Sequence, residues 1–146
     1  MSDGASPVLV IGNKNYSSWS LRAWIALKLS GLAFEEILVR LSTPESGDEL
    51  RRRSPSGRVP VLIHGDLVIP ESLAIIEYAA ELAPGAGLWP EDRAARAEAR
   101  AVAAEMHAGF QALRHHLPMN LRRRRAPVTI DGVVADDIAR ITEIFR

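Results

Sequence analysis

Residues 57–72 read GRVPVLIHGDLVIPES, and this stretch decides the fold. Two apolar runs, Pro60–Ile63 and Leu67–Ile69, flank the turn sequence HGD. Apolar runs on either side of a short glycine-containing turn are typical of a β-hairpin, so the stretch predicts two antiparallel strands. Ser72 follows them and is placed to cap a helix that runs from Leu73 to Leu82.

Upstream of the hairpin, strands and helices alternate. Val8–Ile11 is a short apolar run that predicts a strand buried on both faces. Phe34–Leu41 predicts a second strand, and the polar residues 43–53 predict a short exposed helix. Between the two strands we predict a helix to Leu29, with N-caps offered by Ser17, Ser18 and Ser20 and a stop at Gly31. The order β-α-β-α-β-β-α predicts an α/β domain over residues 1–83, with a mixed sheet whose first two strands are parallel.

Beyond residue 83 the pattern changes to helix alone. Residues 84–90 are rich in proline and glycine, which predicts a linker. From residue 95 to residue 117 apolar side chains recur at spacings of three and four, which predicts one long amphipathic helix ended by Pro118. A break over 127–132 and a further helix over 133–146 complete a predicted all-α region, residues 91–146.

The composition excludes several classes of protein. The chain has 146 residues, 18 basic and 18 acidic side chains, and no cysteine. Disulfide scaffolds, thiolate zinc sites and dithiol redox motifs are therefore excluded, and a reactive sulfur would have to arrive on a ligand. No stretch approaches the roughly 20 apolar residues of a membrane span, and the first residues lack the pattern of a secretory signal. We expect a cytoplasmic protein that does not contact membranes.

The basic and histidine-rich stretches predict neither a nucleic-acid site nor a metal site. Arg51–Arg53 and Arg122–Arg125 lack interleaved aromatic residues, and the whole chain is neutral, so we expect solvated surfaces. His115 and His116 are adjacent on a predicted helix and His107 lies about two turns away, which is poor geometry for one metal ion.

Three places combine side chains that suit a ligand. Ser17-Ser18 opens the first helix, where hydroxyl and free N–H groups favour an anion such as a ligand thiolate. Val59 precedes Pro60, and a cis bond there would turn the Val59 backbone toward an extended ligand. Glu71-Ser72 opens a later helix and suits the ammonium and carboxylate groups of an amino-acid head. Each place also has a purely structural interpretation, as a cap or a loop, which the residues alone leave open.

Taken in order, Ser17-Ser18, Gly57-Arg58-Val59-Pro60 and Glu71-Ser72 make the chain resemble the cytosolic glutathione transferase family over residues 8–117. The resemblance implies a thioredoxin-like domain followed by a helical domain, and a glutathione site built from Arg58, Val59, Pro60, Glu71 and Ser72. It implies that Val59, before a cis Pro60, pairs with the backbone of the cysteinyl unit. Glu71 and Ser72 would hold the γ-glutamyl group. Ser17 would activate the sulfur, with Ser18 or Tyr16 as alternatives.

The serine motif and Arg22 are most similar to the zeta class and related bacterial classes. Zeta enzymes read Ser-Ser-Cys-Ser, whereas Trp19 stands at the cysteine position here. This departure weighs against maleylacetoacetate isomerisation and leaves glutathione binding unaffected, because the serines are kept.

The resemblance implies a homodimeric transferase in which the glutathione thiolate attacks a small, electrophilic, apolar substrate, with no metal and no other cofactor. Two alternatives stay open: a non-catalytic glutathione-binding or protein-interaction module of the same fold, and a zeta-like glutathione-dependent isomerase. The family's helical domain normally continues with further helices, so we expect residues 91–146 to be a truncated helical domain.

Overall fold

The computed structural model describes residues 5–124 and 127–146, so Arg125 of the second arginine run lies outside the described residues. The predicted order β-α-β-α-β-β-α is confirmed, and helices alone follow it. The strands are β1 (Val8–Ile11), β2 (Glu35–Leu38), β3 (Val61–His64) and β4 (Leu67–Pro70). The helices are α1 (Ser18–Ser30), α2 (Ser46–Arg53), α3 (Ser72–Leu82), α4 (Arg93–Ala108), α5 (Gln111–His116) and α6 (Gly132–Ile144), with a 3₁₀ turn, η1 (Pro84–Ala86), between α3 and α4.

The four strands form one mixed sheet in the order β2-β1-β3-β4. β1 and β2 are parallel, as expected for strands joined by a helix, while β3 is antiparallel to both β1 and β4. The hairpin predicted around Gly65 is therefore confirmed. The strand predicted over residues 34–41 is shorter, because only Glu35–Leu38 pairs with β1.

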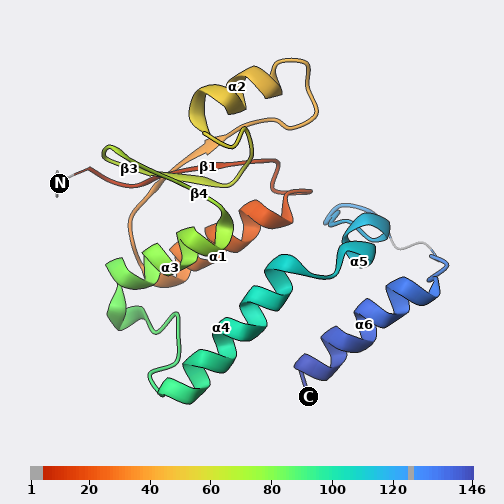
Figure 1. The fold of residues 1–146 in the computed structure, drawn as a ribbon. Helices are drawn as coiled ribbons and strands as arrows, with labels where there is room; N and C mark the ends of the chain where they lie inside the picture. The colour runs from red at the N-terminus through yellow and green to blue at the C-terminus, as the bar shows by residue number, and fades with distance from the viewer. Residues whose placement is uncertain (1–4, 125–126) are drawn as a thin grey trace.

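Helices cover both faces of the sheet (Figure 1). Leu9 and Ile11 of β1 face α1 and α3, where they pack with Leu27 and Ile75. Val10, between them, faces the other way and packs in the cluster that contains Leu50 of α2. This alternation follows from the two-residue period of a strand, so the sheet packs against helices on both faces.

The two helix starts that matter for function are built differently. Of the three serines that the sequence offers as caps, Ser17 is the N-cap of α1, and its Oγ accepts a hydrogen bond from the Ser20 backbone N–H at 3.3 Å. The prediction that Ser72 caps its helix is wrong, because α3 begins at Ser72 itself and Glu71 occupies the N-cap position with φ 77°. The Ser72 Oγ is buried and has no hydrogen-bond partner among the described residues.

The single long helix predicted over residues 95–117 is also wrong, because the chain breaks between α4 and α5. Phe110 takes a left-handed conformation, φ 62°, and is buried, with 7% of its surface exposed. The Arg114 side chain donates to the carbonyl groups of Met106 and Gly109 at the break. The apolar spacing continues across the break, so periodicity alone does not reveal it.

Ion pairs connect the helices of the second half to each other and to the sheet-containing half. Arg100 of α4 donates two hydrogen bonds, of 3.0 and 2.9 Å, to the Glu77 carboxylate of α3, and this bonding lowers the pKa of Glu77. Arg140 of α6 donates in the same way to Glu105 of α4 and lowers the pKa of Glu105. α6 therefore lies beside α4 (Figure 1).

The first arginine run is a solvated, ion-paired helix surface. Arg51 and Arg53 of α2 pair with Asp48 and Glu49 on the same helix, at 2.6 and 3.4 Å. In the part of the chain that the structure describes, no helix has both the length and the apolar character needed to cross a membrane.

Candidate functional site

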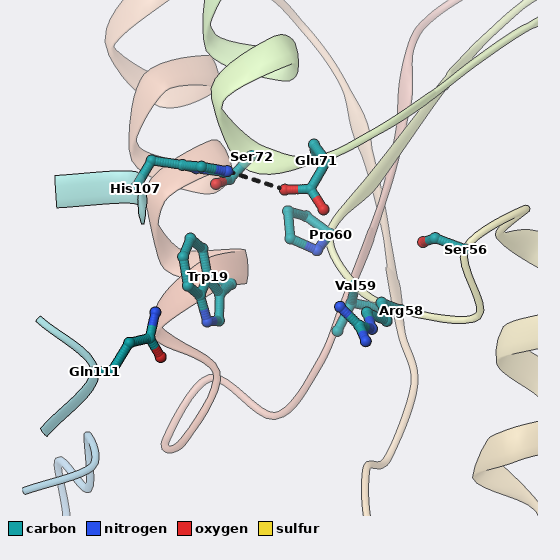
Figure 2. Close-up of a pocket in the computed structure, with 9 residues that line it drawn as sticks. All are labelled: Trp19, Ser56, Arg58, Val59, Pro60, Glu71, Ser72, His107 and Gln111. Carbon is teal, nitrogen blue, oxygen red and sulfur yellow. Dashed lines mark ion pairs between the residues drawn. The ribbon is translucent and has the colours of Figure 1, made fainter. Parts of the chain in front are cut away.

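A pocket of about 350 Å³ lies between the end of the sheet and α4 (Figure 2). The structure brings five of the predicted site residues into its wall, although they come from two separate stretches of sequence. The complete lining is Trp19, Ser56, Arg58, Val59, Pro60, Glu71, Ser72, His107 and Gln111.

The loop before β3 contributes the first group. The Val59–Pro60 peptide bond is cis, which confirms the sequence-based expectation. Pro60 is buried and Val59 half-buried, while Arg58 is exposed at the rim. The Ser54 hydroxyl accepts a hydrogen bond from the Arg58 backbone N–H at 3.3 Å and holds this loop. Arg58, Val59 and Pro60 therefore border the pocket on this side.

The start of α3 contributes the second group. The Glu71 carboxylate is exposed to 57% of its side-chain area, and the left-handed backbone of Glu71 is a conformation that costs of the order of 1–3 kcal/mol. Ser72 is 1% exposed, and its unpartnered hydroxyl lies in the pocket wall. Because buried polar groups are rarely left without a hydrogen bond, the orphaned Ser72 hydroxyl suggests a ligand atom.

The serines that open α1 do not line this pocket. Ser17 and Ser18 line an adjoining hollow, which shares Trp19, Arg58 and Val59 with the first pocket. The Ser17 hydroxyl donates to the Ser20 hydroxyl at 2.8 Å. The Ser20 hydroxyl in turn accepts from the Gly12 backbone N–H at 3.0 Å.

Ser18 and Tyr16 are more open than Ser17. The Ser17 residue is 9% exposed and its hydroxyl proton points at Ser20, whereas Ser18 is half-buried and Tyr16 is 58% exposed. All three side chains reach the adjoining hollow. The start of α1 therefore offers three hydroxyl groups beside Val59, of which that of Ser17 already has a protein acceptor.

Sequence reasoning missed four pocket residues, which are Trp19, Ser56, His107 and Gln111. His107, from the last turn of α4, places its Nε2 3.4 Å from a Glu71 carboxylate oxygen (Figure 2). Its ring meets the Trp19 ring edge to face, with centroids 5.2 Å apart. His107 and Gln111 flank the helix break, and no local signal in the sequence links that break to residues 57–72.

Trp19 also contacts two guanidinium groups. The Arg22 Cζ atom lies 4.3 Å and the Arg114 Cζ atom 4.8 Å from the Trp19 ring centroid. Burial lowers the pKa of Arg22, and the charge of Arg114 lowers it further. Trp19 thus connects α1 to the helical half, and two positively charged guanidinium groups lie against its ring.

Among the described residues, no group of three or more histidine, aspartate and glutamate side chains is arranged to hold a metal ion.

The second arginine run lies on the surface. Its residues Arg122, Arg123 and Arg124 are exposed to solvent.

Comparison with known proteins finds a family match for the sheet-containing half of the chain. The sequence profile of the glutathione S-transferase N-terminal domain matches residues 16–82. Residues 16–82 therefore match the glutathione S-transferase N-terminal domain. The matched range contains every site residue predicted from the sequence, and it confirms the resemblance that those residues carry.

Relatives of this glutathione S-transferase domain include proteins named for an isomerase. The chain is 39% identical to a probable maleylacetoacetate isomerase of Caenorhabditis elegans over 111 residues, which are 76% of this chain and 50% of that protein. It is 39% identical to a probable maleylacetoacetate isomerase of Vibrio cholerae over 125 residues, which are 83% of this chain and 55% of that protein. The chain spans about half the length of the curated relatives it matches.

Solved glutathione transferase structures share the fold beyond the N-terminal domain. A glutathione transferase homologue from Burkholderia, crystallised with bound glutathione, superimposes with a TM-score of 0.73 at 26% identity. The match covers 95% of this chain and 65% of that one. The thioredoxin-like domain followed by a helical region is therefore confirmed as the fold class.

Proposed function

We propose that this chain belongs to an enzyme that binds glutathione in the pocket of Figure 2 and activates its thiol for attack on a small electrophile. One observation carries the proposal: the exposed carboxylate of Glu71 lies in one pocket beside the buried hydroxyl of Ser72, which has no hydrogen-bond partner in the described part of the chain. An ammonium group pairs with the first and a carboxylate accepts from the second. The α-amino-acid head of glutathione carries both groups.

The loop before β3 suits the rest of the tripeptide. Val59 presents its backbone beside the pocket, where an extended peptide pairs with it in the manner of an added strand. Arg58 at the rim provides positive charge for a carboxylate. Bound in this way, glutathione supplies the sulfur nucleophile that a chain without cysteine lacks.

The hydroxyl groups at the start of α1 then stabilise the thiolate. Ser17 and Ser18 both remain candidates, and the geometry favours Ser18 because the Ser17 proton is already directed at Ser20. A hydroxyl donor and the helix N-terminus together favour the charged form of the thiol. Lowering a thiol pKa from about 8.5 to about 6.5 requires roughly 2.7 kcal/mol, which a few such interactions supply.

Calorimetric titration with reduced glutathione tests the binding step. We expect saturable binding that weakens about tenfold, roughly 1.4 kcal/mol, in Glu71→Gln and in Ser72→Ala. The control is Asp66→Asn in the hairpin turn, which should leave the affinity unchanged because Asp66 lies outside the pocket. Absence of binding to the folded wild-type chain would refute the proposal.

Conjugation to a chromogenic aryl halide tests the chemical step and separates the transferase from a non-catalytic module. The module predicts retention on immobilised glutathione without turnover. The transferase predicts turnover whose rate falls when the thiol-activating hydroxyl is removed.

Glutathione-dependent isomerisation is the second candidate. It is supported by the two relatives that carry the name probable maleylacetoacetate isomerase, both 39% identical to this chain. Trp19, at the position where the zeta motif has cysteine, fills part of the pocket wall. An assay with a cis-configured dicarboxylic enone, with Trp19→Cys as the comparison variant, decides whether isomerisation or conjugation is faster.

The organisation of the whole protein is part of the proposal. We place the glutathione-binding domain at residues 1–83, a linker at 84–90 and the start of a helical domain at 91–146.

A cytoplasmic homodimer is supported by the family resemblance alone. Light scattering of the purified chain tests the dimer, for which the expected mass is twice the 16.0 kDa of one chain.

A further inference from the structure

A side pocket of about 120 Å³ adjoins the main pocket, the one of Figure 2, at the start of α3. Ser72 and His107 line both pockets. Glu71 lines the main pocket and not the side pocket, whereas Arg22 of α1 lines the side pocket and not the main one. The two pockets therefore share the Ser72 residue but differ in the charge of their lining. The other residues of the side pocket are Leu73, Ile76, Ala103 and Met106.

The side pocket contains a buried hydroxyl group that lacks an acceptor. Among residues 5–124 and 127–146, the buried side-chain polar atoms without a hydrogen-bond partner are the Ser72 Oγ and the His107 Nδ1, and both residues line this pocket. Ser72 is only 1% exposed. A polar group buried to this extent costs free energy unless it is hydrogen-bonded. The Ser72 hydroxyl therefore requires an acceptor that the described chain does not supply.

The start of α3 adds backbone donors beside this hydroxyl. α3 has 11 residues and begins at Ser72, and Glu71 at the N-cap position makes no side-chain cap bond. The first N–H groups of a helix have no acceptor within the helix, and the helix dipole favours an anion there. The N-terminus of α3 and the Ser72 hydroxyl therefore favour the same kind of ligand atom, a negatively charged oxygen.

Arg22 provides a positive charge without a carboxylate partner. In the described part of the chain, no acidic side chain lies within ion-pair distance of its guanidinium group, which makes one long hydrogen bond, 3.4 Å, to the Met106 carbonyl. Its Cζ lies 4.3 Å from the Trp19 ring centroid, and this stacking orients the guanidinium plane. Burial and the like charge of Arg114 lower the pKa of Arg22, so a nearby anion would stabilise its charged form.

We propose that the side pocket is a carboxylate site, in which Arg22, the Ser72 hydroxyl and the first N–H groups of α3 bind one carboxylate group. A guanidinium group forms two charge-assisted hydrogen bonds with a carboxylate. The carboxylate belongs to the ligand of the main pocket or to a free small acid such as formate. With glutathione as the ligand, the ammonium group faces Glu71 and the α-carboxylate faces Arg22, with Ser72 between them. That case rests on the proposed function, because it takes the ligand head to be an α-amino acid.

Calorimetric titration of the full chain with glutathione, and with the glutathione analogue that lacks only the α-carboxylate, tests the first source. In Arg22→Gln we expect the affinity for glutathione to fall about tenfold and the affinity for the analogue to change less than about twofold. Arg22→Lys keeps the charge and loses the planar fork, so its loss for glutathione should be intermediate.

Arg114→Gln is the matched control. Arg114 stacks on the same Trp19 ring and donates to the same Met106 carbonyl, but it does not line the side pocket. This variant should change the affinities for glutathione and for the analogue by the same factor. A role of Arg22 in packing alone predicts the same result for Arg22→Gln.

Thermal melting in sodium formate and in sodium chloride of equal ionic strength tests the second source. We expect formate to raise the Tm of the wild type by about 2 °C relative to chloride and to leave that of Arg22→Gln unchanged. If Arg22→Gln unfolds, as judged by circular dichroism, Arg22→Lys replaces it, and the titrations of the wild type are repeated in both salts. Formate should then weaken the binding of glutathione and not that of the analogue.

The outcomes separate the inference from the proposed function. A loss confined to glutathione assigns the site to the ligand head, and a formate effect that depends on Arg22 without such a loss assigns it to a free acid. Equal losses for glutathione and the analogue, together with no formate effect that depends on Arg22, overturn the carboxylate site and leave the proposed function intact. Absence of glutathione binding to the folded wild type refutes the proposed function, and the melting experiment then decides the carboxylate site by itself.

Discussion

Asn15 and Asn120 are hydrogen-bonded to each other although 105 positions separate them in sequence: the Asn15 side-chain amide donates to the Asn120 Oδ1 at 3.0 Å. Two further bonds reinforce the contact. The Asn15 carbonyl accepts from the Leu121 N–H at 3.3 Å, and its Oδ1 accepts from the Arg122 N–H at 2.8 Å. The segment after α5 is therefore fastened to the loop that leads into Ser17 and Ser18.

Removing this contact should loosen the loop. In Asn15→Ala we expect faster amide hydrogen exchange over residues 13–18 and 119–123, because the side chain supplies two of the three bonds. Asn15→Asp keeps the acceptor for the Arg122 N–H and should give an intermediate effect. Unchanged exchange in Asn15→Ala would show that the contact does not order the loop.

The activity of the Asn15→Ala variant on an aryl halide should fall about 3- to 10-fold, which corresponds to roughly 0.7–1.4 kcal/mol.

The two serines should separate in a pH–rate profile. We expect Ser18→Ala to shift the acidic limb of conjugation to higher pH and to lower the rate at neutral pH about 10- to 100-fold, because a thiolate donor is lost. Ser17→Ala should mainly lower the thermal stability, by about 1 kcal/mol, through loss of the α1 cap. The opposite assignment of the two effects would identify Ser17 as the thiol partner. Full activity in both variants would exclude the serine mechanism.

Glu77→Gln should weaken the attachment of α4 to α3 in a pH-dependent way. The bonds from Arg100 lower the pKa of Glu77 from its ordinary value of 4.5, and a carboxylate with a lowered folded-state pKa stabilises the fold above the unfolded-state value. We therefore expect the wild type to have a slightly higher Tm than Glu77→Gln at pH 7. The difference should shrink as the pH falls below about 4.5. Melting curves at pH 7, 5 and 3 measure it, and a difference that is constant with pH would argue against the ion pair.

Gly109→Ala tests the break between α4 and α5. A Cβ atom on Gly109 would lie 2.9 Å from the Glu105 carbonyl oxygen, which is backbone and cannot move aside cheaply. We expect a loss of about 1–3 kcal/mol in the free energy of unfolding. Gly132→Ala is the matched control, because a Cβ on Gly132 meets nothing within 4 Å, and it should change stability by less than about 0.5 kcal/mol. Equal denaturation curves for the two variants would mean that the break is not needed for the fold.

The sheet was predictable because its signals are local. The HGD turn, the apolar runs beside it and the serine cap at Ser17 each depend on residues close in sequence, and each appears in the structure. The helix break at Phe110 was not predictable in this way. The apolar period continues through it, and the left-handed residue is held by contacts from Arg114 and by burial of Phe110 itself.

The candidate site likewise has one part that is predictable from local sequence and one part that is not. Arg58, Val59, Pro60, Glu71 and Ser72 lie within 15 positions of one another, and the hairpin returns them to one end of the sheet. His107 joins them only because α4 packs beside α3, a contact held partly by Glu77 and Arg100. Nothing near His107 in sequence distinguishes it from the other histidines of the helical half.

The surroundings of Trp19 give the molecule an optical reporter. The chain has three tryptophans, and the other two lie away from the pocket, where Trp24 donates to Glu36 and Trp89 donates to Glu77. Trp19 itself lines the pocket, and its ring meets the His107 ring edge to face. With Trp24 and Trp89 changed to phenylalanine, the remaining indole emission would follow the arrival of a ligand in the pocket, without any attached dye.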